Sequence, residues 1–175
     1  ARLDENEEFA RDFFSKMGEL GLLGILIPTE YGGSGGDPIS CTLIMEEIAY
    51  VCGGTALSYA AHAVLCLNNL CVNANEQQRR KYLPDLCSGK TIGAWAITEP
   101  EAGSDALSLR TKALKKGDEY IINGTKMFIT NGPNADIIVI YAKTDPAAGN
   151  KGISSFIIEK EFKGYSSGKK LSKLG

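Results

Sequence analysis

The sequence has very little histidine, and its cysteines lack the spacing of a metal site. It contains one histidine, His62, and its five cysteines, at positions 41, 52, 66, 71 and 87, are never spaced as C-x-x-C. An odd number of irregularly spaced cysteines argues against a disulfide framework and against a zinc site. His62 is a poor partner for a cysteine nucleophile, because its i+4 neighbour Cys66 lies in a run that is typical of a core. We therefore expect no metal site, and cysteines that serve as small buried hydrophobes in a reducing compartment.

A strong charge of either sign and an unbroken apolar run are also missing. The 175 residues carry 19 Lys and Arg against 21 Asp and Glu, so charge gives no reason to expect nucleic acid or an anionic membrane as partner. The uncharged, apolar stretch over residues 55–75 is interrupted by His62 and by Asn68, Asn69 and Asn73. We predict a buried helix there and no membrane span. We also expect no secretory or transit signal, because the first residues lack its pattern.

The pattern of apolar residues changes near residues 88–91. Before this point apolar residues recur at helical spacing, and after it they alternate as in strands. We therefore predict an α+β fold of two domains, with an all-α helical domain over residues 1–90 and an antiparallel, β-barrel-like domain over residues 91–175. The tight turns and the lack of βαβ units exclude a parallel nucleotide-binding fold.

Four helices are expected in the first domain, one ending near Gly21 and three over residues 38–51, 55–74 and 76–86. Their inward faces are expected to include Phe9, Phe13, Met17 and Leu20 in the first helix and Ile39, Cys41 and Leu43 in the second. Residues 22–28 are expected to run extended, and Asn75 is the expected N-cap of the fourth helix.

Six strands are expected in the second domain, over residues 92–98, 107–115, 120–123, 126–130, 137–143 and 153–159. Two turns join some of them. Lys116-Gly117-Asp118 and Asn123-Gly124 both have the composition of tight hairpin turns, and an Asn-Gly pair is the strongest such signal.

Two segments about 25 residues apart, residues 96–105 and 126–132, carry the most informative pattern. Thr98 and Thr130 each end an apolar, strand-like run and precede a turn rich in Gly, Pro or Asn. Such an arrangement can aim hydroxyls and backbone N–H groups at one planar polar ligand. We expect the nearby carboxylates of Glu99 and Asp105 to fix the loop by accepting backbone N–H bonds, and not to act as a general base.

The stretches A-I-T-E-P-E-A-G-S-D and K-M-F-I-T-N-G, in this order and after a G-G-S-G-G loop, resemble the flavin-cradling strands of the acyl-CoA dehydrogenase family. The similarity extends over nearly all of residues 20–175. It includes S-Y-A-A-H at 58–62, N-E at 75–76 with K-Y-L-P at 81–84, and Y-A-K-T-D at 141–145. Within the family, these patterns are most similar to the enzymes for isovaleryl-CoA and other short branched acyl groups.

The resemblance implies FAD as cofactor and assigns its contacts position by position. The residues implied to hold it are Trp95, Ala96, Ile97, Thr98, Gly103, Ser104, Phe128, Ile129 and Thr130. The two threonines would supply donors to the polar edge of the flavin, which favours the anionic reduced form, and the apolar side chains would supply walls. Most relatives have tryptophan at Phe128, so this chain keeps an aromatic wall but loses an indole N–H. Ser104, Asn150 and Lys151 are implied to contact the coenzyme A moiety of the substrate.

The reaction implied by the resemblance is α,β-desaturation of a short, branched acyl-CoA. A carboxylate removes the α-proton while the β-hydrogen leaves as hydride to the flavin. In the family this base comes from a later helical region, a C-terminal bundle, so we expect no catalytic residue within these 175 residues and little activity from them alone. The resemblance further implies an electron-transfer flavoprotein as partner, a homotetramer, and the mitochondrial matrix or the bacterial cytoplasm as location.

Two alternatives remain open from the sequence. The first is a sibling on the same fold, such as an acyl-CoA oxidase, whose reduced flavin would react rapidly with oxygen. The second is a truncated, non-catalytic binding relative that uses its helical half as an interaction surface. Failure to bind flavin even with the C-terminal region supplied would favour the second alternative.

Overall fold

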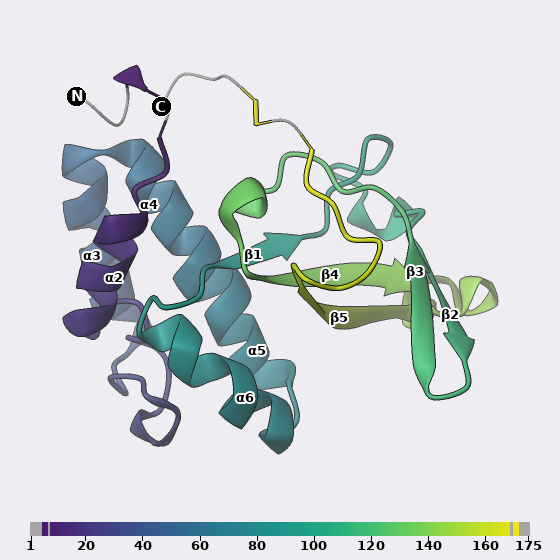
Figure 1. Cartoon of the computed structure of the whole chain (residues 1–175), viewed down its shortest axis with the longest axis horizontal. Helices are drawn as coiled ribbons and strands as arrows, with labels where there is room; N and C mark the ends of the chain where they lie inside the picture. The colour runs from purple at the N-terminus through teal and green to yellow at the C-terminus, as the bar shows by residue number, and fades with distance from the viewer. Residues whose placement is uncertain (1–4, 7, 169, 172–175) are drawn as a thin grey trace.

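The computed structural model describes residues 5–6, 8–168 and 170–171 and places a group of helices beside a five-stranded sheet (Figure 1). The helices are α2 (Arg11–Glu19), α3 (Pro38–Val51), α4 (Gly53–Ala60), the π-helix η2 (Ala61–Asn68), α5 (Asn69–Asn73) and α6 (Glu76–Cys87). The strands are β1 (Gly93–Ala96), β2 (Lys112–Lys116), β3 (Glu119–Asn123), β4 (Ile137–Lys143) and β5 (Ile153–Glu159). The predicted class, a helical domain followed by a β domain, is confirmed.

Two helices begin where their capping residues predict. Asp37 accepts a hydrogen bond from the Ser40 N–H at 2.8 Å, and Pro38 occupies the first turn of α3, where its missing N–H has no cost. Asn75 and Gln78 form a reciprocal capping box at the start of α6. The cap predicted at Asn75 is therefore confirmed.

The helical half is organised around one continuous helix formed by α4, η2 and α5. Cys66, Leu67 and Leu70 on this helix are buried in one cluster with Leu83 and Leu86 of α6. By length and composition alone, the 21 residues from Gly53 to Asn73 could cross a membrane. Their buried face packs against α6 and the sheet, which is the behaviour of the core helix of a folded domain.

Parts of the predicted apolar stripes face solvent. In α2 the fully buried phenylalanine is Phe14, whereas Phe13 is 46% exposed and Leu20 is also exposed. In α3 only Cys41 is buried as predicted, because Ile39, at 72% exposure, and Leu43 lie on an uncovered side. Adjacent helix positions differ by about 100°, and the sequence pattern does not show which side of the helix its neighbours cover.

Residues 22–28 form consecutive turns, so the prediction of an extended segment was wrong. The Ile27 and Ser34 N–H groups both donate to the Gly24 carbonyl, at 3.0 and 2.9 Å. The glycine-rich loop therefore folds back on this segment. A Cβ on Gly33 would meet the Ile27 backbone at 2.0 Å, so this close approach requires glycine.

The sheet is mixed, which corrects the predicted antiparallel pairing. β1 lies parallel to β4, with Ala94 beside Ile138, whereas β2–β3 and β4–β5 are antiparallel. β2 also meets β4 in parallel, where Lys112 pairs with Lys143. The chain passes from β1 to its parallel neighbour β4 through the β2–β3 hairpin and two short 3-10 helices, and not through an α-helix. Apolar alternation shows which face a residue occupies, but it does not show the direction of the neighbouring strand.

Residues 126–130 do not form the predicted strand. They belong to the loop that crosses beside β1 (Figure 1), and φ is positive at Phe128 and Asn131, at 58° and 65°. Left-handed backbone at these positions is incompatible with a regular strand. The loop is the second of the two segments singled out in the sequence, so the correction bears directly on the site.

One of the two predicted hairpins is present. Lys116 pairs with Glu119 across the turn at Gly117, where φ is 63°. Asn123-Gly124 does not form a hairpin, because β3 ends there and the chain continues as a loop. A Cβ on Gly124 would lie 2.2 Å from the Thr111 hydroxyl, so this glycine serves close approach of two segments.

His62 connects the central helix to both neighbouring elements. Its Nε2 donates to the Leu86 carbonyl at the end of α6 at 3.0 Å, and its Nδ1 accepts from the Gly93 N–H of β1 at 2.9 Å. The ring is fully buried and lies edge-on to Phe14. Because the Gly93 N–H needs an acceptor, these partners select the neutral tautomer with its proton on Nε2.

We expect His62 to make folding sensitive to mild acid. Burial lowers the pKa of His62 to about 4, from an ordinary value of 6.5. Between these values the unfolded chain binds a proton that the folded chain does not, so stability falls as the pH falls from 6.5 towards 4. Urea unfolding at pH 7 and pH 4 should show a loss of about 3 kcal/mol from this residue. His62→Gln should lack this part of the pH dependence, and an unchanged profile would contradict the assignment.

Candidate functional site

The two threonine segments meet at the carboxyl end of β1. The Met127 N–H donates to the Thr98 carbonyl at 2.9 Å, and the Lys126 Nζ donates to the Ile97 carbonyl at 3.2 Å. These contacts bring the exit of β1 and the loop before Asn131 side by side (Figure 1). The sequence prediction that both segments serve one place in the fold therefore has a geometric basis.

A buried ion pair holds the two threonine segments together at the carboxyl end of β1, which we call the junction. Glu99 and Lys126 have side chains only 5% and 11% exposed, and their charged atoms lie 2.8 Å apart. Glu99 also accepts from the backbone N–H groups of Arg110 and Thr111 and from the Thr111 hydroxyl. Burial alone would raise the pKa of Glu99, but the bonds from Lys126, Thr111 and the backbone outweigh it and lower this pKa to about 2. Glu99 thus fixes the loop, and its carboxylate is a poor proton acceptor at neutral pH.

The hydroxyls of Thr98 and Thr130 are unused. Both side chains are half-buried, and neither hydrogen bonds to another group in the part of the chain that the structure describes. Phe128, in the same loop, is 65% exposed. Positive φ is uncommon for residues other than glycine and is often found where backbone strain serves a binding site. The junction offers two hydroxyl donors and an accessible aromatic ring from one short stretch of surface.

The predicted walls of the site do not share one face of the sheet. Trp95 lies on the helical side, where its ring meets the Tyr141 ring edge-on at 5.8 Å and its Nε1 donates to the Tyr141 hydroxyl at 3.3 Å. Asn69 of α5 donates to the same hydroxyl at 2.9 Å. Ala96 is buried in a different cluster, with Ile129 packed against it. Because its side chain is covered, Ala96 can offer a ligand only its backbone.

The residues predicted to contact coenzyme A lie on two exposed loops. Ser104 lies between β1 and β2, next to Gly103 of the predicted FAD contacts, and Asn150 and Lys151 lie in η5 (Pro146–Gly152) between β4 and β5. Because β1 and β4 are parallel, both loops leave the same edge of the sheet (Figure 1). Within the described residues, the side chains of Ser104, Asn150 and Lys151 make no hydrogen bond, so their polar groups remain available.

Asp105, predicted to accept a backbone N–H bond through its carboxylate, instead accepts from the Ser108 hydroxyl. The Ser108 N–H donates to the Asp105 carbonyl oxygen at 3.1 Å. Asp105 still fixes the loop as expected, but the partner of its side chain is a hydroxyl. An Asp and a Ser three residues apart are typical of such a turn.

The sequence pattern indicated no role for Asn131, which the structure places between the start of β1 and the central helix. Its Nδ2 donates to the Ser58 carbonyl at 2.9 Å and to the Gly93 carbonyl at 3.2 Å. Its Oδ1 is buried and has no partner among the described residues, a state that costs about 1–3 kcal/mol if it stays dry. In the sequence, Asn131-Gly132 has the composition of an exposed turn, and nothing distinguishes it from one.

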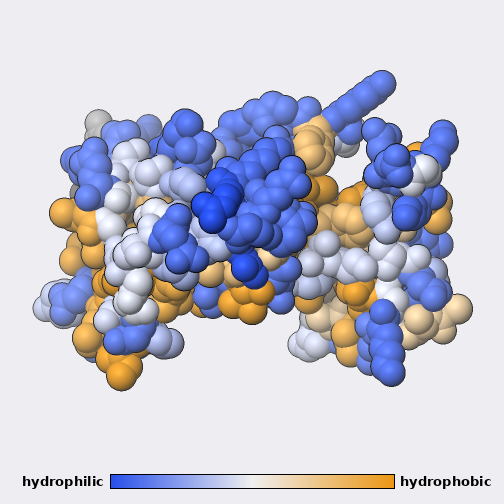
Figure 2. Space-filling model, turned by 90° about the horizontal axis from the view of Figure 1, so that it is seen from below, coloured by the Kyte–Doolittle hydropathy of each residue, from blue (hydrophilic) through white to orange (hydrophobic). Residues whose placement is uncertain are grey.

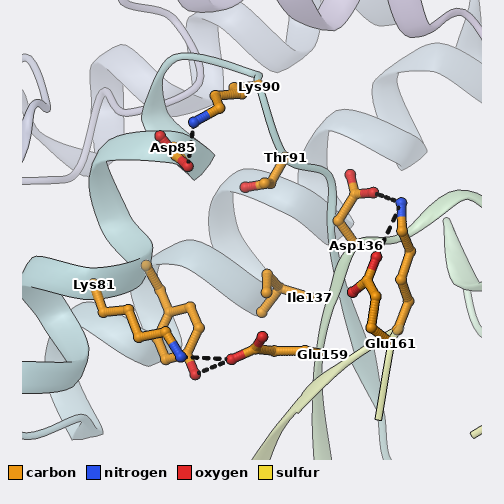
Figure 3. A pocket seen from close by; sticks show the side chains of 10 residues that line it. Lys81, Asp85, Lys90, Thr91, Asp136, Ile137, Glu159 and Glu161 are labelled. Atoms are coloured by element: carbon orange, nitrogen blue, oxygen red, sulfur yellow. Dashed lines mark hydrogen bonds and ion pairs between the residues drawn. The ribbon is translucent and has the colours of Figure 1, made fainter.

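A hollow lies elsewhere, between α6 and β5 (Figure 3). Its volume is about 310 Å³, and its lining is strongly charged. The charges are already paired, Lys81 with Glu159 at 2.6 Å, Lys90 with Asp85 at 2.9 Å, and Lys160 with Asp136. A charged ligand would have to displace these pairs. We therefore assign the hollow to the contact between helices and sheet and not to ligand binding.

Arg79, Arg80 and Lys81 form a basic run on α6 beside this hollow. Arg79 is half-buried and donates to the Val72 carbonyl at 3.4 Å, whereas Arg80 and Lys81 are largely exposed, and Arg80 pairs with Glu76 of the same helix at 2.6 Å. Figure 2 shows strongly hydrophilic residues gathered over the middle of this face of the molecule. Such a run is a solvated helix surface, which agrees with the absence of any excess positive charge in the sequence.

Comparison with known domains defines the class of protein. The family model described as "Acyl-CoA dehydrogenase, N-terminal domain" matches residues 1–90, and the model described as "Acyl-CoA dehydrogenase, middle domain" matches residues 94–175. The helical half and the mixed sheet correspond to these two domains in order. The chain belongs to the acyl-CoA dehydrogenase family.

The chain is also similar to individual members of the family. Mitochondrial isovaleryl-CoA dehydrogenase from Pongo abelii is 52% identical over 177 residues, which cover 99% of this chain and 42% of that protein. The short-chain-specific acyl-CoA dehydrogenase of Clostridium acetobutylicum is 49% identical, over 100% of this chain and 46% of that protein. A crystal structure of a Bacillus anthracis acyl-CoA dehydrogenase complexed with FAD is 40% identical with a TM-score of 0.87, covering 94% of this chain and 28% of that one. The chain spans less than half the length of the curated relatives it matches.

Proposed function

We propose that this chain forms the flavin-holding part of an FAD-dependent acyl-CoA dehydrogenase that desaturates a short, branched acyl-CoA. One observation carries the proposal: the hydroxyls of Thr98 and Thr130 lie on adjoining segments and have no partner in the described part of the chain. Two such donors suit the polar edge of an isoalloxazine ring. Membership in the family and the FAD complex of a similar structure support this choice of ligand.

The residues present fit the cofactor. Thr98 and Thr130 would hold its polar edge, and the exposed ring of Phe128 would supply an aromatic wall. Ala96 ends β1 and can offer its backbone, and Gly103 and Ser104 lie on the segment that follows, all within the stretch assigned to FAD by resemblance. Bound FAD supplies the hydride acceptor, and donors aimed at its polar edge stabilise the negative charge of its reduced form.

The chain's own residues would bind and orient the substrate and leave proton removal to another group. Ser104, Asn150 and Lys151 have free polar groups on two loops at one sheet edge, where they would hold the coenzyme A moiety. Glu99 is unsuited to act as base, because its pKa is about 2 and Lys126 neutralises it. We infer that the base belongs to the C-terminal region of the complete enzyme.

Similarity to the isovaleryl-CoA and short-chain enzymes supports a short, branched acyl group as substrate. Family membership supports an electron-transfer flavoprotein as electron acceptor and a homotetramer as the assembled form. Mitochondrial and bacterial relatives support the mitochondrial matrix or the bacterial cytoplasm as the place of action.

A fusion of this chain to the C-terminal region of an isovaleryl-CoA dehydrogenase tests the function. We expect the fusion to bind FAD, and isovaleryl-CoA without oxygen to bleach the flavin band at about 450 nm. The unfused chain should cause no such bleaching, because it lacks the base. A folded fusion without FAD would contradict the proposal and favour a binding-only relative, and rapid reoxidation of the reduced flavin by oxygen would instead indicate an oxidase.

A further inference from the structure

Asn131 joins three parts of the fold at one point. It follows Thr130 directly, only 6% of its surface is exposed, and its φ is 65°. Its Nδ2 donates to the Ser58 carbonyl of α4 and to the Gly93 carbonyl of β1. One side-chain amide therefore connects the loop of residues 124–131, which we call the threonine loop, to both the central helix and the strand that leads to Thr98.

The acceptor on the helix lies where the helix changes its hydrogen-bonding pattern. α4 ends at Ala60 and continues as the π-helix η2, and the Ala61 N–H is shared between the Leu57 and Ser58 carbonyls. A change from i→i+4 to i→i+5 bonding leaves carbonyls at the junction incompletely satisfied. The Asn131 amide supplies a second donor to the Ser58 carbonyl at this change.

The acceptor on the strand is held from both sides. The Gly93 N–H donates to His62, which belongs to the same central helix, while the Gly93 carbonyl accepts from Asn131. The start of β1 is thereby fixed to the central helix through its N–H and to the threonine loop through its carbonyl. Since Gly93 to Ala96 is one short strand, this contact also sets where Thr98 emerges.

We propose that Asn131 is the positioning residue that holds Thr130 at the start of β1 and beside the central helix. For its effect on cofactor binding this inference rests on the proposed function, but its effect on the loop does not. The left-handed backbone alone would permit glycine or aspartate as well as asparagine. Only the amide, however, can donate two hydrogen bonds to two carbonyl oxygens.

Three substitutions separate the amide from the backbone. Asn131→Asp keeps the shape and the left-handed preference but places a carboxylate against two carbonyls. Asn131→Gly keeps the backbone freedom and removes the side chain. Asn134→Asp makes the same chemical change three residues away, where the structure records only backbone contacts, and serves as the matched control.

The first readout is hydrogen exchange of the Met127 amide in the full 175-residue chain without cofactor. This amide donates to the Thr98 carbonyl and reports whether the two segments stay together. We expect exchange at Met127 to be at least tenfold faster in both Asn131→Asp and Asn131→Gly, and unchanged in Asn134→Asp. Unchanged exchange in Asn131→Asp, or a rescue by Asn131→Gly, would overturn the inference.

The second readout is an FAD titration of the same variants in the fusion with the C-terminal region, followed by visible absorption. The dissociation constant for FAD should rise about tenfold in Asn131→Asp, with an altered shape of the bound flavin band, and should stay at the wild-type value in Asn134→Asp. Faster Met127 exchange with no FAD bound by the wild type would support the positioning role and count against the proposed function. Wild-type FAD affinity and an unaltered band in Asn131→Asp would overturn the inference while the proposed function stands.

Discussion

Glu99→Ala is expected to lower the free energy of unfolding by about 3–5 kcal/mol, the usual cost of breaking a buried ion pair from one side. The substitution leaves the ammonium group of Lys126 buried without its counter-charge, because the Lys126 side chain is only 11% exposed. It also leaves the Arg110 and Thr111 N–H groups without their acceptor. Urea unfolding followed by circular dichroism measures the loss directly.

Glu101→Ala is the matched control, because Glu101 lies two residues away and pairs with Arg110 at the surface. Both of those side chains are more than half exposed, so we expect a change below about 1 kcal/mol. Removing the stranded amine should recover part of the loss, so Glu99→Gln with Lys126→Met should be more stable than Glu99→Gln alone. If Glu99→Ala behaved like the control, the ion pair would not hold the junction.

We expect the Glu99 carboxylate to cause a second loss of stability in acid, at a lower pH than the loss caused by His62. The pKa of Glu99 is lowered in the folded chain to about 2 from an ordinary 4.5. Its stabilising contribution is therefore complete above pH 4.5 and is lost as the pH falls towards 2. The Glu99→Gln variant should lack this loss while keeping the transition of His62 between pH 6.5 and 4.

Replacing the two threonines should have the largest effect on the cofactor. We expect Thr98→Val or Thr130→Val to weaken FAD binding, or to slow flavin reduction in the fusion with the C-terminal region, by roughly tenfold to a hundredfold. Each change removes one donor from the polar edge of the ring, and the double variant should lose more than either single one. Because valine matches threonine in shape and both side chains are half-buried, we expect stability to change little.

Thr125→Val provides the control for these variants. Thr125 lies in the same loop but is exposed, and it is not among the residues assigned to the flavin. Its substitution should leave FAD affinity and the reduction rate at wild-type values. Equal effects from Thr125→Val and Thr130→Val would mean that the loop as a whole, and not the Thr130 hydroxyl, contributes to binding.

Local chemistry in the sequence predicted much of the helical half. Asp37 with Pro38 and Asn75 with Gln78 are caps made within a few residues, so the starts of α3 and α6 could be read directly. The inward face of α2 could not, since Phe13 and Phe14 are equally apolar and only the tertiary neighbours decide between them. Sheet topology failed for a similar reason, because parallel pairing of β1 with β4 depends on contacts across more than forty residues of chain.

The sequence pattern singled out two segments that do meet in the fold, but it missed the form of the second one. The resemblance to the family implied that Thr98 and Thr130 contact FAD, and the structure places their segments in contact with each other. The strand expected at residues 126–130 is a loop, because Phe128 and Asn131 have left-handed backbones that apolar alternation does not indicate. Lys126 was missed as a partner of Glu99, since a lysine beside an apolar run is more often solvated than buried.

The role of the two threonine segments is best tested by an FAD titration, followed by visible absorption, of the chain and of its fusion with the C-terminal region. We expect saturable binding of one FAD per chain with a perturbed flavin band, and loss of that binding in the Thr98→Val, Thr130→Val double variant. Failure of both forms to bind FAD, or equal binding by the double variant, would contradict the claim that the two threonine segments hold the cofactor.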